Sequence, residues 1–243
     1  MDAGFSARLF DFEEFADSGT RIVREHGALP GVVGRLGGQR GRFRMEGRAA
    51  YHAGGVTYDG QTQGGRPLTS RTDERILDLG VRAGYRPLGA PFELMPYVAI
   101  GYLLWERDIR GTGNVRGLQE RYGWSSLAAG ADATLYRKGR VSVGLDARVL
   151  RTQGPESRVT FGQPYDAVTL ALGNEWGGRL GIPVRMPLKN GLSLSIAPWA
   201  EAWSLGRSPN QTLTSGGVPV GTVFQPRSES WSLGIDITIG KTR

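Results

Sequence analysis

The chain has 243 residues, including 38 Gly, 13 Pro and no Cys, and 39% of its residues are hydrophobic. This length suits one large all-β domain or two small ones, and because no boundary between two domains is visible we expect a single domain over residues 1–243. The lack of Cys excludes disulfides and thiol chemistry. No apolar run approaches the ~20 residues that a membrane-spanning helix needs, so the chain would have to cross a bilayer as a β-barrel.

The formal net charge is +7, from 30 basic and 23 acidic residues. An excess of positive charge is typical of proteins that bind nucleic acids. The sequence has neither a basic stripe interleaved with aromatic residues nor an RNA- or DNA-binding motif, so we expect no nucleic-acid partner.

Alternation of apolar and polar residues with a period of two runs through the chain, and no segment shows a helical period. In residues 42–59, for example, Phe43 and Met45 share one parity, whereas Arg48 and His52 share the other. The pattern predicts about ten strands, at residues 5–16, 20–39, 42–59, 71–86, 92–107, 119–136, 141–152, 166–186, 192–206 and 228–241.

Short and long connections alternate between these predicted strands. Tight turns are expected at residues 38–41, 87–90, 137–140 and 187–191, and longer loops at residues 60–70, around 111–113, at 154–164 and at 207–227. This alternation, with strands long enough for a tilted bilayer crossing, is typical of outer-membrane barrels.

The last predicted strand carries a polar residue, a Gly two positions later, and large apolar residues five and seven positions later, as Ser232, Gly234, Ile237 and Ile239. This spacing resembles the assembly signal of bacterial outer-membrane β-barrels. The resemblance implies an antiparallel transmembrane β-barrel in the outer membrane of a Gram-negative bacterium, with short periplasmic turns, longer external loops and both termini in the periplasm. Residues 1–4 lack the charged and apolar regions of a signal peptide, so we expect a mature sequence behind an added initiator Met, with a cytosolic protein as the alternative.

A soluble barrel or sandwich with its apolar face turned inward would have the same periodicity. The polar face favours the membrane, because its charged residues are interspersed with Gly and Ser, as in a packed polar lumen. The surplus of positive charge would then lie at the short turns, for example at Arg40, Arg137 and Lys189, beside anionic lipid headgroups. Outer-membrane lipids are therefore expected partners, although solvated turn residues explain these charges equally well.

The polar parity of the strands supplies charges of both signs, and we expect them to form a network that largely plugs a lumen too narrow for an open pore. The expected members are Arg35, Glu46, Arg48, His52, Asp78, Arg82, Asp132, Asp146, Arg148, Glu175, Arg179 and Glu201, and we also place Arg8, Arg44, Arg185 and Asp236 in the lumen. A turn centred near Arg40 would bring residues whose numbers sum to about 81 opposite each other, which predicts a cross-strand pair between Arg35 and Glu46.

The chain has only two His, His26 and His52, and no Cys, so we expect no metal site and no cofactor. Omptin proteases use an Asp-x-His segment and lipid A deacylases a His-Ser pair on one strand, and this sequence contains neither. We expect a non-enzymatic protein: a structural or binding barrel whose long loops meet an external ligand or protein, or a very narrow, porin-like solute pathway. The alternative is a lipid- or peptide-hydrolysing barrel enzyme that uses His52 with lumen carboxylates.

Overall fold

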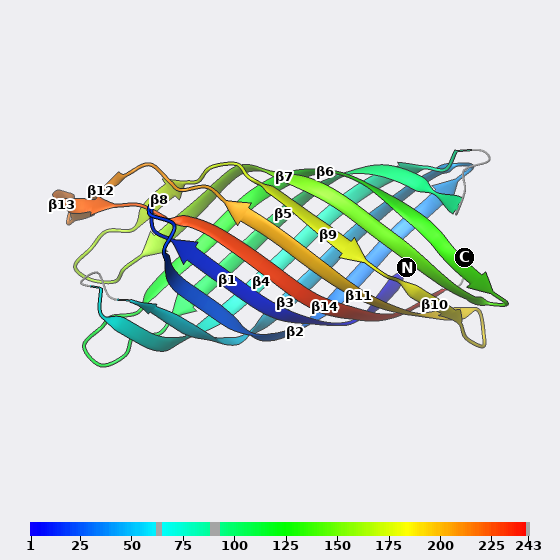
Figure 1. The fold of residues 1–243 in the computed structure, drawn as a ribbon, viewed down its shortest axis with the longest axis horizontal. Helices are drawn as coiled ribbons and strands as arrows, with labels where there is room; N and C mark the ends of the chain where they lie inside the picture. Colours follow the sequence, from blue (N-terminus) through cyan, green and yellow to red (C-terminus); the bar gives the residue numbers. More distant parts are fainter. Residues whose placement is uncertain (62–64, 88–92, 242–243) are drawn as a thin grey trace.

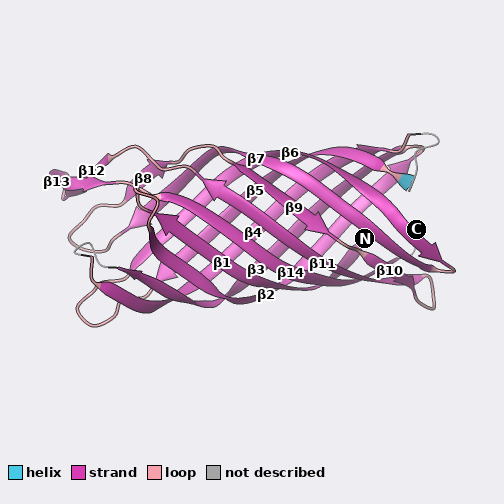
Figure 2. Cartoon of the chain, viewed as in Figure 1, coloured by secondary structure: helices cyan, strands magenta, loops and turns pink. Residues whose placement is uncertain are grey.

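The computed structural model describes residues 1–61, 65–87 and 93–241, and it forms a long, closed β-barrel (Figure 1). Strands make up nearly all of the wall (Figure 2). They are β1 (Asp2–Phe15), β2 (Arg21–Arg40), β3 (Phe43–Gln61), β4 (Pro67–Tyr85), β5 (Met95–Ile109), β6 (Leu118–Lys138), β7 (Val141–Thr160), β8 (Val168–Ala171), β9 (Trp176–Gly181), β10 (Val184–Pro187), β11 (Leu192–Leu205), β12 (Gln211–Ser215), β13 (Val218–Val223) and β14 (Arg227–Lys241). In these described residues, no helix is both long and apolar enough to span a membrane.

Neighbouring strands pair in antiparallel fashion around the whole wall. β1 pairs with β14 from Asp2↔Gly240 to Phe15↔Arg227, and this pairing closes the barrel. The strands β8, β9 and β10 are three pieces of one wall strand that lies between β7 and β11. The wall therefore has ten strands, which confirms the predicted all-β antiparallel barrel.

The two ends of the barrel differ. One end, which we call the turn end, has the short connections at residues 41–42, 139–140 and 188–191, together with the start of β1 and the end of β14 (Figure 1). The opposite end, the loop end, has residues 110–117 and 161–167 and the separate β12–β13 hairpin. The predicted turn at residues 87–90 extends into residues that lie outside the described part of the chain.

Several predicted boundaries at the loop end are wrong because the strands continue further than expected. Residues 60–70 were expected to form a loop, yet β3 and β4 pair as far as Gln61↔Pro67. Likewise, β7 extends to Thr160 through much of the loop expected at residues 154–164. Residues 207–227, also expected as a loop, contain the β12–β13 hairpin.

The strand predicted at residues 166–186 is interrupted twice. Before β9, Gly173 forms an isolated bridge with Gly206, and a Cβ on Gly173 would come within 3.0 Å of the Gly206 Cα. Between β9 and β10, Pro183 has no N–H group to donate to a neighbouring strand, so the regular ladder stops there. Close backbone contact and a missing donor thus divide one wall strand into three pieces.

Large apolar side chains cover the outside of the barrel, as expected for the membrane barrel. Phe5, Leu36 and Val98 are 76%, 66% and 64% exposed. The soluble alternative, with this apolar face turned inward, is therefore wrong. Toward the loop end the outward-facing positions become charged, for instance at Arg75, the outward-facing residue next to Leu77 on the loop-end side. We call the outer surface between these charges and the short turns the apolar band.

The register between β2 and β3 differs from the prediction by two residues. Gly41, with φ of 60°, lies in the left-handed region, and the turn consists of Gly41 and Arg42 between the pair Arg40↔Phe43. Arg35 therefore lies opposite Arg48, and Glu46 lies opposite Gly37. The predicted cross-strand pair between Arg35 and Glu46 is wrong, although both side chains belong to lumen-facing positions.

An arginine in the centre of the apolar band should destabilise the barrel in a membrane. Val81 is the middle one of the outward-facing residues of β4 from Leu77 to Tyr85 and is 47% exposed. We expect Val81→Arg to lower the free energy of unfolding by about 2–4 kcal/mol, because its charge would face hydrocarbon. The measurement is urea unfolding in lipid vesicles, followed by Trp fluorescence. As a control, Gln119→Arg places the same charge on the outer face near the loop end, and equal losses in the two variants would contradict the position of the band.

Candidate functional site

The lumen changes in chemical character from the turn end to the loop end. Successive lumen-facing residues of β1 show the order, since Arg8 is followed by Phe10, Phe12 and Glu14, and all four are buried. We distinguish a charged layer next to the turn end, an aromatic plug above it, and an acidic cap around Arg107 at the loop end. Each layer is built by side chains that several neighbouring strands contribute at the same height.

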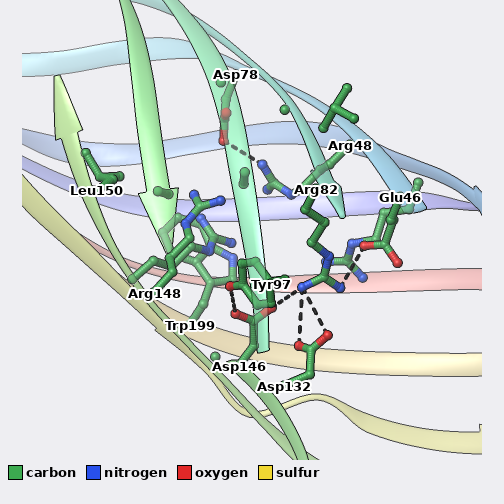
Figure 3. Close-up of a pocket in the computed structure, with 18 of the residues that line it drawn as sticks. Glu46, Arg48, Asp78, Arg82, Tyr97, Asp132, Asp146, Arg148, Leu150 and Trp199 are labelled. Atoms are coloured by element: carbon green, nitrogen blue, oxygen red, sulfur yellow. Dashed lines mark hydrogen bonds and ion pairs between the residues drawn. The ribbon is translucent and has the colours of Figure 1, made fainter. Parts of the chain in front are cut away.

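In the part of the charged layer nearest the turn end, three carboxylates converge on Arg82 of β4. Its guanidinium lies 2.9 Å from Glu46, 2.8 Å from Asp146 and 3.2 Å from Asp132 (Figure 3). Tyr97 donates a hydrogen bond of 2.7 Å to Asp146, and its ring lies 4.9 Å from the Arg82 guanidinium carbon. This arrangement offsets part of the desolvation of Arg82 and of its three carboxylate partners.

Deeper in the charged layer, Glu201 of β11 contacts three arginines. Its carboxylate lies 3.3 Å from Arg8, 3.3 Å from Arg148 and 3.2 Å from Arg179. Glu201 and Arg8 are both buried, at 7% and 1% exposed, so each charge depends on the other for compensation.

Asp236 of the closing strand β14 links further members of the same layer. It contacts Arg35 at 2.6 Å and accepts a hydrogen bond of 3.0 Å from the Trp199 indole N–H. Its more distant ion pairs, with Arg48 at 3.7 Å and Arg179 at 3.9 Å, connect it to the arginines around Glu201. Arg48 itself pairs with Asp78 at 2.5 Å, as Figure 3 shows.

Glu175 is the one predicted network residue that stands apart. It lies between β8 and β9, and within the described residues its carboxylate forms no ion pair. Its backbone N–H donates to the Thr152 hydroxyl at 2.8 Å instead. Glu175 continues the register of β9 toward the loop end, where its C=O accepts a hydrogen bond of 3.0 Å from the Thr152 N–H. It lies four residues from Arg179 along the chain, so it does not join Arg179 in the charged layer. The other predicted members all take part in ion pairs or hydrogen bonds of the lumen.

His52 is fully buried and belongs to a short hydrogen-bonded chain. The Ser6 hydroxyl donates to Asp236 Oδ1 at 2.7 Å and lies 2.9 Å from His52 Nε2. Because the single hydroxyl proton of Ser6 is used toward Asp236, His52 Nε2 must donate to Ser6, which makes His52 the Nε2–H tautomer. His52 Nδ1 has no partner among the described residues.

Apolar side chains fill the lumen above the charged layer. We call this group the aromatic plug, and its buried members are Phe10, Phe12, Leu29, Val56, Ile76, Trp105, Tyr122, Trp124, Leu172, Trp203 and Leu205. The ring centroid of Trp105 lies 4.7 Å from that of Tyr122 and 4.8 Å from that of Phe12, and Trp203 lies 5.0 Å from Trp124. Strands from both sides of the barrel thus meet across the lumen, and the plug spans its cross-section.

The acidic cap above the plug is organised around Arg107, which is 2% exposed. Its guanidinium pairs with Glu120 at 2.5 Å and with Glu14 and Glu25 at 3.0 Å each. Glu74, the fourth buried carboxylate, accepts a hydrogen bond from the Trp105 indole N–H. The sequence prediction missed this cap, although its members have lumen parity near the loop ends of their strands.

The β12–β13 hairpin is attached to the loop before β8 through Asp166. The Asp166 carboxylate accepts hydrogen bonds from the Gly217 N–H at 2.9 Å and from the Thr214 hydroxyl at 2.7 Å. These donors stabilise the charged form and lower the pKa of Asp166 below its usual value. The hairpin leaves Val218 and Val220 exposed, at 62% and 52%.

A cavity of about 120 Å³ lies in the charged layer. One side is formed by small residues of β4, β5 and β6, including Gly80, Gly101 and Ser126. The adjacent strands β3 and β7 contribute Arg48 and Arg148 to the lining (Figure 3). Across the described part of the chain, no group of three or more His, Asp or Glu residues is placed to hold a metal ion.

No protein-family model matches the chain, and no curated protein does. Among solved structures, the outer membrane protease OmpT from Escherichia coli has a TM-score of 0.58 and 9% sequence identity, and the match covers 100% of this chain and 96% of OmpT. The β domain of the Bordetella autotransporter BrkA has a TM-score of 0.42 and 12% identity, over 98% of this chain and 99% of that domain.

At this low identity the likeness to OmpT shows the fold alone. The chain has the fold of the bacterial outer-membrane β-barrels, which confirms the fold that the Ser232, Gly234, Ile237 and Ile239 spacing predicted.

Proposed function

We propose that this protein is a closed, non-enzymatic β-barrel of the bacterial outer membrane, with its loop end outside the cell and both termini in the periplasm. The observation that carries the proposal is the aromatic plug, in which Trp105, Tyr122 and Phe12 are fully buried. A ten-stranded barrel encloses only slightly more space than an eight-stranded one, which its own side chains can fill. Here large rings occupy that space, so the lumen does not provide a water-filled path.

The orientation rests on the contrast between the two ends. In outer-membrane barrels short turns face the periplasm and long loops face outward. The turn end of this barrel has two-residue connections at residues 41–42 and 139–140, whereas the loop end carries the β12–β13 hairpin. Because Val218 and Val220 on that hairpin are exposed, we expect the loop end to contact an external partner with an apolar surface.

The arrangement around His52 argues against the hydrolase alternative. A Ser nucleophile needs a His that accepts its proton, and the acid normally contacts that His. Here Asp236 contacts Ser6 instead, and His52 donates to the Ser6 hydroxyl. Ser6 and His52 are 4% and 0% exposed, and neither lines the cavity, so a substrate has no access to them.

Conductance in a planar lipid bilayer tests the closed lumen. We expect the purified protein to insert without producing regular single-channel steps, since the aromatic plug blocks the lumen. A ten-stranded barrel refolded under the same conditions and known to conduct serves as the positive control. Large, regular steps from the unmodified protein would contradict the proposal and favour the narrow solute pathway.

A further inference from the structure

Part of the charged layer holds more arginines than carboxylates. We call Arg8, Arg35, Arg48, Arg148 and Arg179 the arginine cluster. Among the described residues, its ion-pair partners are Asp78, Glu201 and Asp236. Five positive charges against three negative ones leave two positive charges uncompensated when all groups are ionised. Buried charges of one sign in excess attract a ligand of the opposite sign.

The hydrogen bonding of the arginine cluster also indicates a ligand that carries negative charge. Within the part of the chain that the structure describes, the buried donors Arg8 Nε and Nη1, Arg48 Nε and Nη2, and Arg148 Nε have no acceptor. All carboxylate oxygens of Asp78, Glu201 and Asp236 are either hydrogen-bonded or solvent-accessible. The arginine cluster therefore lacks acceptors, and a group that brings oxygen lone pairs would satisfy it.

A cavity lies beside the arginine cluster, and four of its members, Arg35, Arg48, Arg148 and Arg179, line it. Its volume of about 120 Å³ exceeds the roughly 10–15 Å³ that a single water needs. Gly80, Ala99 and Gly101 of β4 and β5 have no side chain longer than a methyl group, and this leaves the space that Arg48 and Arg148 face. Toward the turn end, the cavity lining continues to Asp132 and Arg185, so the cavity extends away from the plug.

We propose that the arginine cluster binds a small oxyanion, in the form of a phosphate or carboxylate group, which enters the cavity from the turn end. Guanidinium groups present paired N–H donors that match both kinds of group. The Arg179 guanidinium carbon lies 3.9 Å from the Trp199 ring centroid, and this stacking holds its N–H groups in a fixed plane. The proposal does not depend on the absence of conductance, because the cavity lies on the turn-end side of the plug.

Calorimetric titration of the refolded full chain in detergent tests the proposal, with inorganic phosphate and acetate as separate probes and choline chloride to match ionic strength. We expect saturable one-site binding of at least one probe. Arg148→Gln should weaken binding at least tenfold, because Arg148 lines the cavity and the substitution removes one positive charge from the arginine cluster. Arg148→Lys retains the charge and should weaken binding less.

Two further variants separate a specific site from a general effect of charge. Asp78→Asn removes the carboxylate that pairs with Arg48 at 2.5 Å, so we expect it to tighten binding severalfold. Arg121→Gln removes an arginine from the outer surface, where its side chain is 61% exposed, and should leave binding unchanged. The proposal is overturned if neither probe binds saturably, as in a cavity that holds only water. It is also overturned if Arg121→Gln weakens binding as much as Arg148→Gln.

Discussion

Glu201→Gln is expected to lower the free energy of unfolding by about 3–5 kcal/mol, which is the range for removing one partner from a buried ion pair. Glu201 contacts Arg8, Arg148 and Arg179, and the Arg8 side chain is only 1% exposed. The glutamine keeps the size of the side chain but leaves these three guanidiniums without a shared counter-charge. Among the described residues, Glu201 is the only carboxylate within 4 Å of Arg8. Arg8 therefore loses its close counter-charge, and this accounts for most of the loss of stability.

The matched control is Glu106→Gln on the outer surface. Glu106 pairs with Arg75 and Arg121 at 3.6 Å each, and both arginine side chains are more than half exposed. Water screens these pairs, so we expect a change of at most about 1 kcal/mol. Both variants are compared with the wild type by urea unfolding in lipid vesicles. A loss in Glu201→Gln no greater than that in Glu106→Gln would show that the lumen pairs do not stabilise the barrel.

Strand parity could be predicted from the sequence because it depends only on alternation along one strand. The partners of each charged residue could not, since they depend on the turn. The predicted register between β2 and β3 was displaced by two residues, and a shift of two keeps every side chain on its face. Arg35 and Glu46 therefore have the predicted lumen parity, whereas Arg35 pairs with Asp236 and Glu46 with Arg44 and Arg82.

The aromatic plug was missed for a different reason, although β5 contains a signal for it. Tyr102 and Leu104 face outward, and the lumen-facing Leu103 and Trp105, which alternate with them, are also apolar. Apolar residues on both parities indicate that the lumen itself is apolar at that height. The partners of Trp105 could not be identified, because the tilt of the strands decides which residues of distant strands reach the same height.

The wall strand that consists of β8, β9 and β10 shows what could not be predicted from a short stretch of sequence. Pro183 is a local signal for an interruption within residues 166–186, since proline cannot donate to a ladder, but the prediction of one continuous strand did not use it. The close approach of Gly173 to Gly206 depends on β11, which is distant in sequence. Glu175 lies two residues after Gly173 and four before Arg179. Its height relative to the charged layer depends on the tilt of the strands, which its own segment does not show.

Trp105→Ala is expected to destabilise the barrel by about 3–5 kcal/mol, the range for truncating a large buried aromatic residue. Trp105 is 0% exposed and packs against Tyr122 and Phe12. The truncation also removes the indole N–H that donates to the buried carboxylate of Glu74. Trp105→Phe is the control, because it loses the N–H group but keeps a ring in the plug. Equal stability of the two variants by urea unfolding would show that the ring does not contribute through packing.

The same residues decide whether the plug closes the lumen. In the double variant Trp105→Ala/Trp203→Ala, two rings with centroids 5.6 Å apart are removed from the centre of the plug. Water can then reach from the acidic cap to the charged layer, so we expect small conductance steps in a planar bilayer where the wild type gives none. The outer-surface double variant Trp176→Ala/Trp231→Ala removes two tryptophans that are 58% and 47% exposed and should give none. If the plug variant folds and still does not conduct, the ion pairs of the charged layer close the lumen without help from the plug.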